Sequence, residues 1–521
     1  MALNHYDAII IGAGHNGLVA AAYLARQGKK VLVLERRSIV GGSVVTESFG
    51  EGFAVNSVQT GGTLRPDIIK DLKLSFPSST SHGLDTSGTS TRSTRPAPLS
   101  ARPAFISLQP DGNHLTLNVE SIKRFSEKDA ARWPEFVRFM NKAAEILDAA
   151  YATIMPRLPK NLSLSDGYGL LELGLELRLA GRKDMLNFIR ALPMNAQELL
   201  EEYFESEQVK AAIASVAIHG NTLGPMSAGT GYTLIHNWLN RNGLSIFQLP
   251  LSMGEGRDVW GIGAITYTLA NVVKSFGGEI RTNAEVMKIR VEHQVAKSVL
   301  LANGEEMTAN TILSSADPKH TLLKLVGAME LPPEFVWHAQ SIKMRGSVAK
   351  VHLQTNGNHG IPQGTLVLAP SIKYLEKAYD AAKYGEISEK PYLEVTTLGE
   401  VVSIHFQFAP YQLKNSSWQV EGLKVEKLAV DTLAEYVPNL KSSIVNTKTI
   451  TPKDLEDTYS LTEGDLNHGQ LMLDQFLFMR PMPGWSNHKT PIDNLYLCGS
   501  GVHGGGGVSG AAGRNVVKVL K

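Results

Sequence analysis

Three glycines near the start of the chain are the first residues whose spacing points to a chemistry. Gly12, Gly14 and Gly17 form the pattern G-x-G-x-x-G between an apolar run, residues 8–11, and an alanine-rich stretch, residues 18–27. In a strand–loop–helix unit, the first glycine permits a tight turn, the second lets the backbone approach a pyrophosphate, and the third lets helix and strand pack closely. The N-terminus of the helix adds unpaired N–H groups and partial positive charge. The pattern therefore predicts a dinucleotide site, with contacts from Gly12, Ala13, Gly14, Asn16 and Gly17.

An acidic residue follows the next predicted strand, as the motif requires. Residues 31–34 form a second apolar run, and Glu35 comes directly after it. A carboxylate at this position accepts hydrogen bonds from an adenosine ribose. The two apolar runs and the helix between them should form a right-handed unit with parallel strands. This context supports the motif, but it does not separate NAD from FAD as the ligand.

A second glycine cluster lies near the C-terminus. Residues 494–498 predict a strand and residues 511–520 predict a helix, and the stretch between them is rich in glycine. Glycine loses more conformational freedom on folding than other residues, so such a density is favoured where the backbone must approach another group closely. A planar isoalloxazine ring is such a group. We therefore expect this loop to contact a flavin, through Gly499, Ser500, Gly506 and Val508.

Both glycine segments resemble parts of one superfamily of flavoproteins. The N-terminal segment is similar to the FAD-binding segment of the amine oxidase and phytoene desaturase superfamily in Ala21, Leu24, Gly28, Glu35, Arg37, Gly41, Gly42 and Ser43. Residues 495–515 resemble the C-terminal signature of phytoene desaturase-like flavoproteins. The resemblance is closer still to the group called pyridine nucleotide-disulfide oxidoreductase domain-containing protein 2, and it covers nearly the whole chain. Its other landmarks are Phe125-Ser126, Asp129-Ala130, residues 202–206, Gly224-Pro225, Gly229-Thr230, Asp317-Pro318 and Arg480-Pro481.

This resemblance implies that FAD is the cofactor and that the chain is an FAD-dependent oxidoreductase. In the superfamily, the arginine and the double glycine contact the adenosine and the pyrophosphate. Contacts are therefore expected from Arg37, Gly41, Gly42 and Ser43, and the backbone at Val286 is expected to meet the adenine.

The sequence differs from the pattern of the group at one segment, and it lacks the redox disulfide that the name of the group implies. The family segment Gly-Gly-Met-Gly is replaced by residues 260–263, in which Trp260 substitutes a large indole for a smaller side chain. Cys498 is the only cysteine, so no intramolecular redox disulfide can form. Residues 501–507 lack the acidic partner on a following strand that a dinucleotide motif requires, so no second site for NAD(P) is predicted.

The sequence does not identify the catalytic residues. His468 matches a histidine of the resembling group, and His503 lies in the C-terminal glycine loop, so both are candidates. For each, a structural role is the alternative, and His15 is interpreted as filling its loop. No H-x-x-x-H pair, G-x-S-x-G elbow or Walker lysine supports a metal site or a nucleophilic mechanism.

These segments predict an α/β fold with two interleaved domains. A Rossmann-like FAD-binding domain should be assembled from residues 1–66, 244–317 and 480–521. A mixed sheet with helices, residues 67–243 and 318–479, should form the substrate domain. Residues 75–104 are rich in Ser, Thr and Pro and predict a flexible insert. The active site should lie where the two domains meet.

The composition and charge of the chain indicate which kinds of partner are expected, nucleic acid or a membrane among them. The net charge of +1 gives no basic excess for nucleic acid, and 43% hydrophobic with 19% charged residues is typical of a globular protein. The stretches 8–25 and 211–240 lack charges, but glycine, proline or asparagine interrupts both, so no transmembrane segment is expected. No targeting signal is seen at residues 1–6, which predicts a cytoplasmic protein, although relatives of the family include mitochondrial proteins. Peripheral membrane contact and the oligomeric state stay open.

The function favoured by these observations is FAD-dependent oxidoreduction of an apolar small-molecule substrate. The step is desaturation, saturation or isomerisation of a C–C bond, with an unknown electron acceptor. One alternative is an amine or amino-acid oxidase, which an aromatic cage and a lysine near flavin N5 would reveal. Another is a flavin-containing binding or regulatory protein with little turnover.

Overall fold

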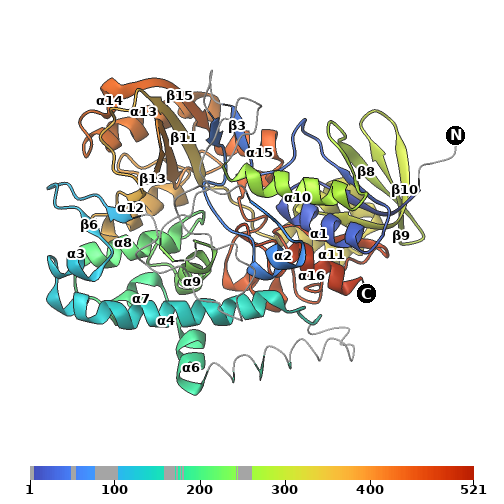
Figure 1. Cartoon of the computed structure of the whole chain (residues 1–521), viewed down its shortest axis with the longest axis horizontal. Helices are drawn as coiled ribbons and strands as arrows, with labels where there is room; N and C mark the ends of the chain where they lie inside the picture. The colour runs from blue at the N-terminus through green and yellow to red at the C-terminus, as the bar shows by residue number, and fades with distance from the viewer. Residues whose placement is uncertain are drawn as a thin grey trace.

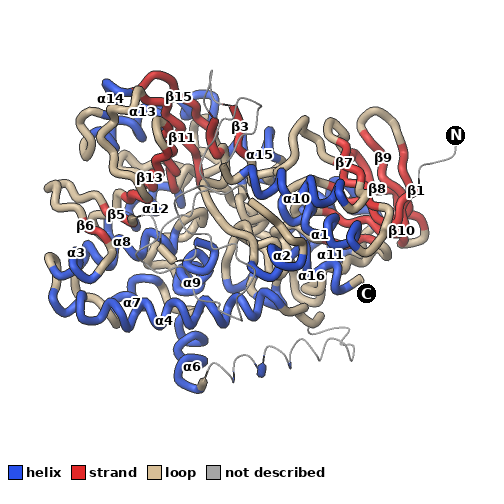
Figure 2. The backbone as a smooth tube through the Cα atoms, viewed as in Figure 1, coloured by secondary structure: helices blue, strands red, loops and turns tan. Residues whose placement is uncertain are grey.

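The computed structural model describes residues 5–48, 54–76, 104–157, 171, 174–175, 178, 181–241, 243–244 and 261–520. Two seven-stranded sheets and a layer of helices make up an α/β fold (Figure 1 and Figure 2). Most of the predicted insert, residues 77–103, lies outside the described residues. In the part of the chain that is described, no helix combines the length and apolar character needed to cross a bilayer.

The first sheet is built from three separate pieces of the chain. Its strands run in the order β7-β2-β1-β10-β9-β8, and β16 pairs with the end of β10. The central pairs β1–β2, β1–β10 and β10–β16 are parallel, whereas β8 and β9 form an antiparallel extension. The bounds are β1 His5–Ile11, β2 Val31–Leu34, β7 Glu279–Arg281, β8 Val286–Glu292, β9 Val295–Leu301, β10 Glu306–Ser314 and β16 Leu495–Leu497.

Helices cover both faces of this sheet. On one face, α1 packs between α10 and α16, and alanines of α1 such as Ala20 and Ala21 are fully buried in the contact. On the other face lie the π-helical segment η2 and helix α11, with Leu322 and Phe335 in the core. The bounds are α1 His15–Arg26, α2 Pro66–Asp71, α10 Gly263–Ser275, η2 His320–Gly327, η3 Ala328–Glu330, α11 Pro333–Ser341 and α16 Ala511–Val519.

The second sheet has the order β15-β11-β14-β13-β12-β5-β6 and is mostly antiparallel. Its apolar side chains, including Val351, Phe406 and Val395, pack against α13. The strand bounds are β5 Phe105–Ser107, β6 Leu115–Thr116, β11 Val348–Thr355, β12 Thr365–Val367, β13 Tyr392–Leu398, β14 Val401–Gln407 and β15 Ile444–Ile450. The flanking helices are α12 Ile372–Lys383, α13 Trp418–Ala434, α14 Leu440–Ser443 and α15 Pro452–Tyr459.

A helical layer lies beside the second sheet, with the long helix α4 at the bottom of Figure 1. Helix α4 is capped by Ser126, whose side chain accepts a hydrogen bond from the Asp129 N–H. The core of the helical layer contains aromatic side chains, among them Trp133, Phe136 and Trp238. The bounds are α3 Val119–Lys123, α4 Glu127–Ala152, α6 Arg182–Ala191, α7 Ala196–Glu201, α8 Glu207–Ile218 and α9 Thr230–Arg241. The remaining short elements are β3 Thr46–Ser48, β4 Ala54–Asn56, η4 Thr462–Gly464, η5 Leu473–Gln475 and η6 Leu477–Met479.

We propose the same interleaved pair of domains that the sequence predicts, with wider edges for the first. Ile68 and Leu72 pack into the core of the first sheet, so its first piece extends through α2. Leu322 and Ile342 pack on the opposite face of the same sheet, so its middle piece extends past residue 317.

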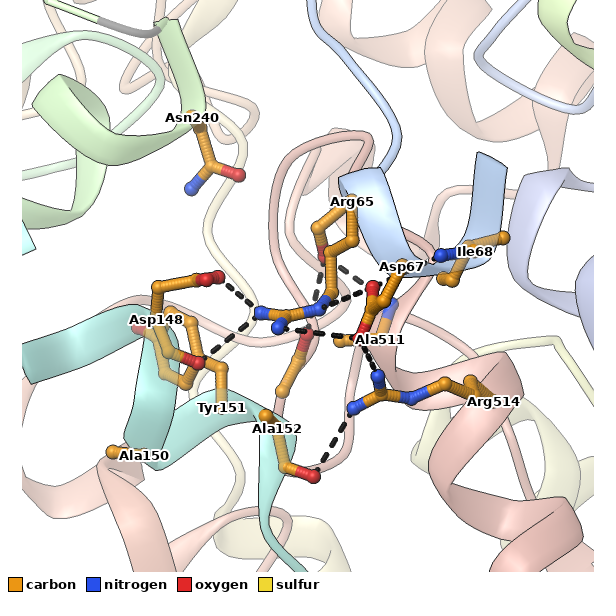
Figure 3. Close-up of polar contacts among 12 residues, drawn as sticks. Arg65, Asp67, Ile68, Asp148, Ala150, Tyr151, Ala152, Asn240, Ala511 and Arg514 are labelled. Atoms are coloured by element: carbon orange, nitrogen blue, oxygen red, sulfur yellow. Dashed lines mark hydrogen bonds and ion pairs between the residues drawn. The ribbon is translucent and has the colours of Figure 1, made fainter. Parts of the chain in front are cut away.

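A cluster of charged groups joins the proposed domains (Figure 3). Arg65 forms ion pairs with Asp67 and, across the junction, with Asp148 of α4. Arg514 of α16 also pairs with Asp67 and donates to the Ala152 carbonyl at the end of α4. The Arg514 side chain is buried and the Arg65 side chain is 10% exposed, so largely shielded ion pairs link α2, α4 and α16 at one point.

The replacement Asp67→Ala should lower the free energy of unfolding by about 1–3 kcal/mol, because two largely shielded arginines lose charge-assisted hydrogen bonds. Denaturant titration of the purified protein measures this loss. The control is Asp474→Ala, which breaks an exposed pair with Lys343 and should change the free energy by about 0.5 kcal/mol or less. Equal losses in the two variants would show that Asp67 does not stabilise the protein through the two arginines.

Candidate functional site

A cavity of about 140 Å³ lies at the carboxyl ends of the central strands of the first sheet. Parallel pairing aligns the strand ends Ile11, Leu34 and Ser314, so the loops that follow them meet there. The structure brings most of the predicted cofactor contacts to this cavity: Gly12, Gly14, Asn16, Glu35, Arg37, Gly41, Gly42, Ser43, Val286 and Ser500, together with His15 and His468.

The three motif glycines occupy different environments. Gly12 has a φ of +90°, which L side chains rarely adopt. At Gly14 an added Cβ would meet nothing within 4 Å, and this residue lines the cavity. At Gly17 the Cβ would lie 2.3 Å from the Gly12 carbonyl oxygen, so only glycine lets α1 pack this closely on the loop. Ala13 does not line the cavity, but its N–H is part of the same loop.

The Glu35 carboxylate is held at the cavity by two backbone groups. Its Oε2 accepts a hydrogen bond of 2.8 Å from the Ala13 N–H, and its Oε1 accepts one of 2.9 Å from the Arg37 N–H. Glu35 is buried and links the glycine loop with the segment after β2. The Arg37 guanidinium pairs with Glu47 and lies over the Tyr459 ring, 4.7 Å from its centroid.

Three buried polar atoms at this cavity have no hydrogen-bond partner among the described residues: Nε2 of His15, Nη1 of Arg37 and Nδ1 of His468. Buried polar groups are nearly always satisfied, so such a concentration points to a missing acceptor. Burial and the neighbouring His468 lower the pKa of His15 to about 4, and burial also lowers the pKa of His468. Both rings are therefore neutral near pH 7, and each carries one N–H. The donor set fits the diphosphate of a dinucleotide.

A second cavity, of about 60 Å³, lies on the other side of the C-terminal glycine loop. Gly507 and Val508 line it from the loop, and residues 59–62 line it from the segment after β4. The opposite wall comes from the end of α8 and from α9, through His219, His236, Asn237, Asn240 and Arg241. The wall residues of α8 and α9 had no signal of their own in the sequence, because their helices have the pattern of ordinary apolar segments.

Gly506 is pinned against α9 beside this cavity. Its φ is +95°, and an added Cβ would lie 2.9 Å from Cε1 of His236. The His236 ring is fixed in turn, since its Nδ1 lies 2.8 Å from the Tyr151 hydroxyl and its Nε2 lies 3.0 Å from Nδ2 of Asn240. The loop therefore has no room for a side chain at Gly506.

Other predicted loop residues lie outside both cavities. An added Cβ at Gly499 would meet the Ser315 carbonyl oxygen at 2.4 Å, so Gly499 packs against the end of β10. His503 is buried and its Nε2 lies 2.9 Å from the Ala150 carbonyl oxygen, which favours a structural role over a catalytic one. Burial raises the pKa of the neighbouring Cys498 thiol, which keeps it protonated.

A cluster of mostly buried polar residues lies next to the second cavity, and the sequence analysis did not predict it. Its members are His219, Arg241, Lys350, Glu394 and His405. Nδ1 of His219 lies 3.2 Å from Glu394, and Arg241 forms a 2.9 Å ion pair with the same carboxylate. Burial raises the pKa of Glu394, but Arg241 and His219 outweigh it and hold the net pKa well below its usual value. Lys350 and His405 complete the cluster, with Nζ and Nδ1 2.9 Å apart. The signal was the alternation of polar and apolar residues in 392–396 and 403–407.

Comparisons with known proteins agree with this geometry. The sequence profile of a family described as flavin containing amine oxidoreductase matches residues 17–514. Pyridine nucleotide-disulfide oxidoreductase domain-containing protein 2 of Rattus norvegicus is 33% identical over 99% of this chain and 93% of its own length. A limonene dehydrogenase polypeptide of Castellaniella defragrans is 25% identical, covering 99% of this chain and 94% of that protein. Phytoene desaturase (lycopene-forming) of Pantoea ananas is 25% identical, covering 97% and 96%.

Solved structures share the fold. A putrescine oxidase variant superimposes with a TM-score of 0.58 over 99% of both chains, at 14% sequence identity. This similarity supports the α/β fold.

The replacement Glu35→Ala should weaken FAD binding without unfolding the protein. Charge-assisted hydrogen bonds from the ribose would be lost, at about 1.5–3 kcal/mol, or roughly tenfold to over a hundredfold in affinity. Titration of the apoprotein with FAD gives the dissociation constants. Glu285→Ala is the matched control, because Glu285 is an exposed carboxylate at the rim of the same cavity. An unchanged constant for Glu35→Ala would mean that the carboxylate does not face the ribose.

The replacement Gly506→Val should abolish stable flavin binding, because a branched side chain would collide with His236 and displace the loop. Flavin content per protein chain after purification measures this. In Gly304→Val, φ is +84° but an added Cβ meets nothing within 4 Å, so this control should lose only about 1–2 kcal/mol of stability and keep its flavin. A fully flavinylated Gly506→Val protein would remove the loop from the flavin site.

Proposed function

Because the chain belongs to the flavin containing amine oxidoreductase family and is an FAD-dependent oxidoreductase, we propose that it acts on a C–C bond of an apolar organic substrate. The reaction is desaturation, saturation or isomerisation of that bond. The observation that carries this proposal is the match, over 97–99% of this chain, to relatives named for phytoene desaturation and limonene dehydrogenation. Both named compounds are hydrocarbons, so neither offers a C–N bond.

We propose that residues of the first cavity hold the adenosine and diphosphate of FAD. Glu35 would accept hydrogen bonds from the ribose, and the backbone at Val286 would meet the adenine. The first turn of α1 has no acidic residue and no side-chain cap, so its N–H groups and partial positive charge suit the diphosphate. His15 and His468 would donate to the same oxygens through their unpartnered nitrogens.

The second cavity is then the place where the substrate meets the flavin ring. When bound, FAD supplies the hydride chemistry. The protein contributes the wall formed by Gly507 and Val508, which brings bare backbone against the ring, and the opposite wall on α9. His219 lies at this wall with its Nδ1 3.2 Å from Glu394, and burial lowers its pKa to about 4, so the neutral ring is placed to accept a proton from the substrate.

Among the described residues, the second cavity does not have the lining expected of an amine oxidase. The alternative of an amine oxidase calls for an aromatic cage and a lysine near the flavin. Within the described ranges, the cavity is lined by no Phe, Tyr, Trp or Lys. Lys350 lies behind the wall and is bonded to His405 rather than directed at the cavity.

Anaerobic spectroscopy of the holoprotein tests the proposed reaction. Oxidised enzyme is mixed with phytoene or limonene as hydrocarbon donors, and with putrescine or cyclohexylamine as amines. Dithionite-reduced enzyme is mixed with lycopene as a hydrocarbon acceptor. We expect bleaching or recovery of the flavin absorbance with at least one hydrocarbon and none with the amines. Reduction by amines alone would favour the oxidase, and no response to any compound would favour a binding protein.

A further inference from the structure

One face of the second sheet is polar although it is buried. Lys350, His405 and Glu394 lie side by side across β11, β14 and β13, as the strand register shows. All three are at most 2% exposed. Their sequence neighbours on the same strands, such as Val351 and Phe406, point to the other face and pack under α13. The polar row is therefore enclosed between this sheet and the helical layer.

The row reaches the second cavity through two side chains. His219 stacks on His405 with ring centroids 4.1 Å apart, and it contacts Glu394. Arg241 contacts Glu394 from α9. Both His219 and Arg241 line the cavity, facing Gly507 and Val508 of the glycine loop. The five residues His219, Arg241, Lys350, Glu394 and His405, here called the polar cluster, thus form the far wall of the substrate cavity and its support.

The charges of the polar cluster do not balance. Arg241 and Lys350 are basic, whereas Glu394 is the single carboxylate, and it is paired with Arg241. Lys350 has no ion-pair partner among the described residues, and its Nζ is bonded to the His405 ring. A buried cation without a counter-charge is unfavourable. Burial lowers the pKa of Lys350 to about 7; the repulsion of Arg241 also lowers it, whereas Glu394 raises it. Near pH 7 the lysine is therefore only partly charged, and a nearby anion would favour its charged form.

One negative charge would complete the cluster. Arg241 uses Nη2 for Glu394 and Nη1 for the Leu244 carbonyl, and a guanidinium has five N–H donors, so further donors are left. A carboxylate brings a single charge and accepts such donors well. A phosphate monoester brings up to two charges, which exceeds the imbalance.

We propose that the polar cluster is a subsite for a carboxylate on the substrate, contacted by Arg241. This inference rests on the proposed function and names its substrate class, an organic acid with an apolar chain. Lys350 is a positioning residue that supplies charge through His405 and does not touch the ligand. The flavin acts on the apolar chain, and the cluster sets which end of the chain enters.

Binding of a matched pair of probes to the oxidised holoprotein tests the subsite. Decanoate and decanamide share one chain and differ in charge, and perturbation of the flavin absorbance reports their dissociation constants. We expect decanoate to bind at least about tenfold more tightly than decanamide. Above pH 7, the protein should also take up a proton when decanoate binds, because the anion raises the pKa of Lys350, and an indicator dye in weakly buffered solution measures this uptake.

The variant Lys350→Met should lose about tenfold in decanoate affinity and lose the proton uptake, with decanamide binding unchanged. Lys350→Gln, which keeps a hydrogen bond to His405, should show the same losses. It replaces Lys350→Met in the test if the methionine variant does not fold. The control is Lys210→Met, because Lys210 is a buried lysine of α8 that already pairs with Glu207.

Decanoate that binds no better than decanamide, including no binding of either, would overturn the subsite. An unchanged preference in the folded Lys350 variants would also overturn it, and would leave the charge of Lys350 to another partner such as reduced flavin. Since these are binding measurements, they fail separately from the proposed reaction. A preference for decanoate without C–C redox chemistry counts against the proposed function. C–C redox chemistry without a preference for decanoate counts against the subsite.

Discussion

The parallel pairing of β10 with β1 on one side and β16 on the other is the constraint on which the rest of the structure depends. Its register aligns Ile11, Ser314 and Leu497, so loops from three distant parts of the chain leave the same edge of the sheet. Ser315 strengthens this edge, because its hydroxyl lies 3.0 Å from the carbonyl oxygens of Ile11 and Gly12. The first cavity exists only because these strand ends coincide, and a one-residue slip would turn their side chains to the other face.

The C-terminal glycine loop connects this edge to the substrate side of the molecule. Near its start, the Ser500 carbonyl accepts hydrogen bonds from the buried Arg480 guanidinium, and the Ser500 hydroxyl accepts one from Asn16. Further along, Gly506 abuts His236 of α9. The loop is therefore held from both proposed domains, and it forms part of the wall of both cavities. Contact between bare backbone and a flat ring is the physical reason for glycine at this place.

The second sheet combines two kinds of packing in one layer. Its apolar face packs against α13 and accounts for stability in the ordinary way, through removal of apolar surface from water. Its polar face contains Lys350, His405 and Glu394, which an apolar core of the same shape would replace without loss. A buried polar network of this kind is justified energetically only when its members are satisfied, and here the last partner is best supplied by a ligand.

Much of the cofactor site could be predicted from the sequence, because its parts are short contiguous motifs. Gly12, Gly14 and Gly17 are demanded by one local turn, and Glu35 follows a strand whose apolar run is visible in the sequence. The order of predicted strands and the resemblance to a flavoprotein superfamily were enough for the fold class and for FAD. Which residues line the two cavities could not be predicted in this way. Only packing between residues hundreds of positions apart placed the unpartnered nitrogens of His15 and His468 at one cavity and bonded His503 to the backbone of α4.

The polar cluster is the clearest example of a site that the sequence does not reveal, because its residues meet only in the tertiary structure. Its five members come from two helices and three strands, and each alone is typical of an ordinary strand or helix end. By itself, the sequence determined the local conformations, since turn geometry and hydrophobic periodicity act between near neighbours. Only the tertiary structure decided that Lys350 has no counter-charge among the described residues and that His219 and Arg241 line the same cavity as the glycine loop. Burial and charge balance depend on what is adjacent in space, which no single segment of the chain encodes.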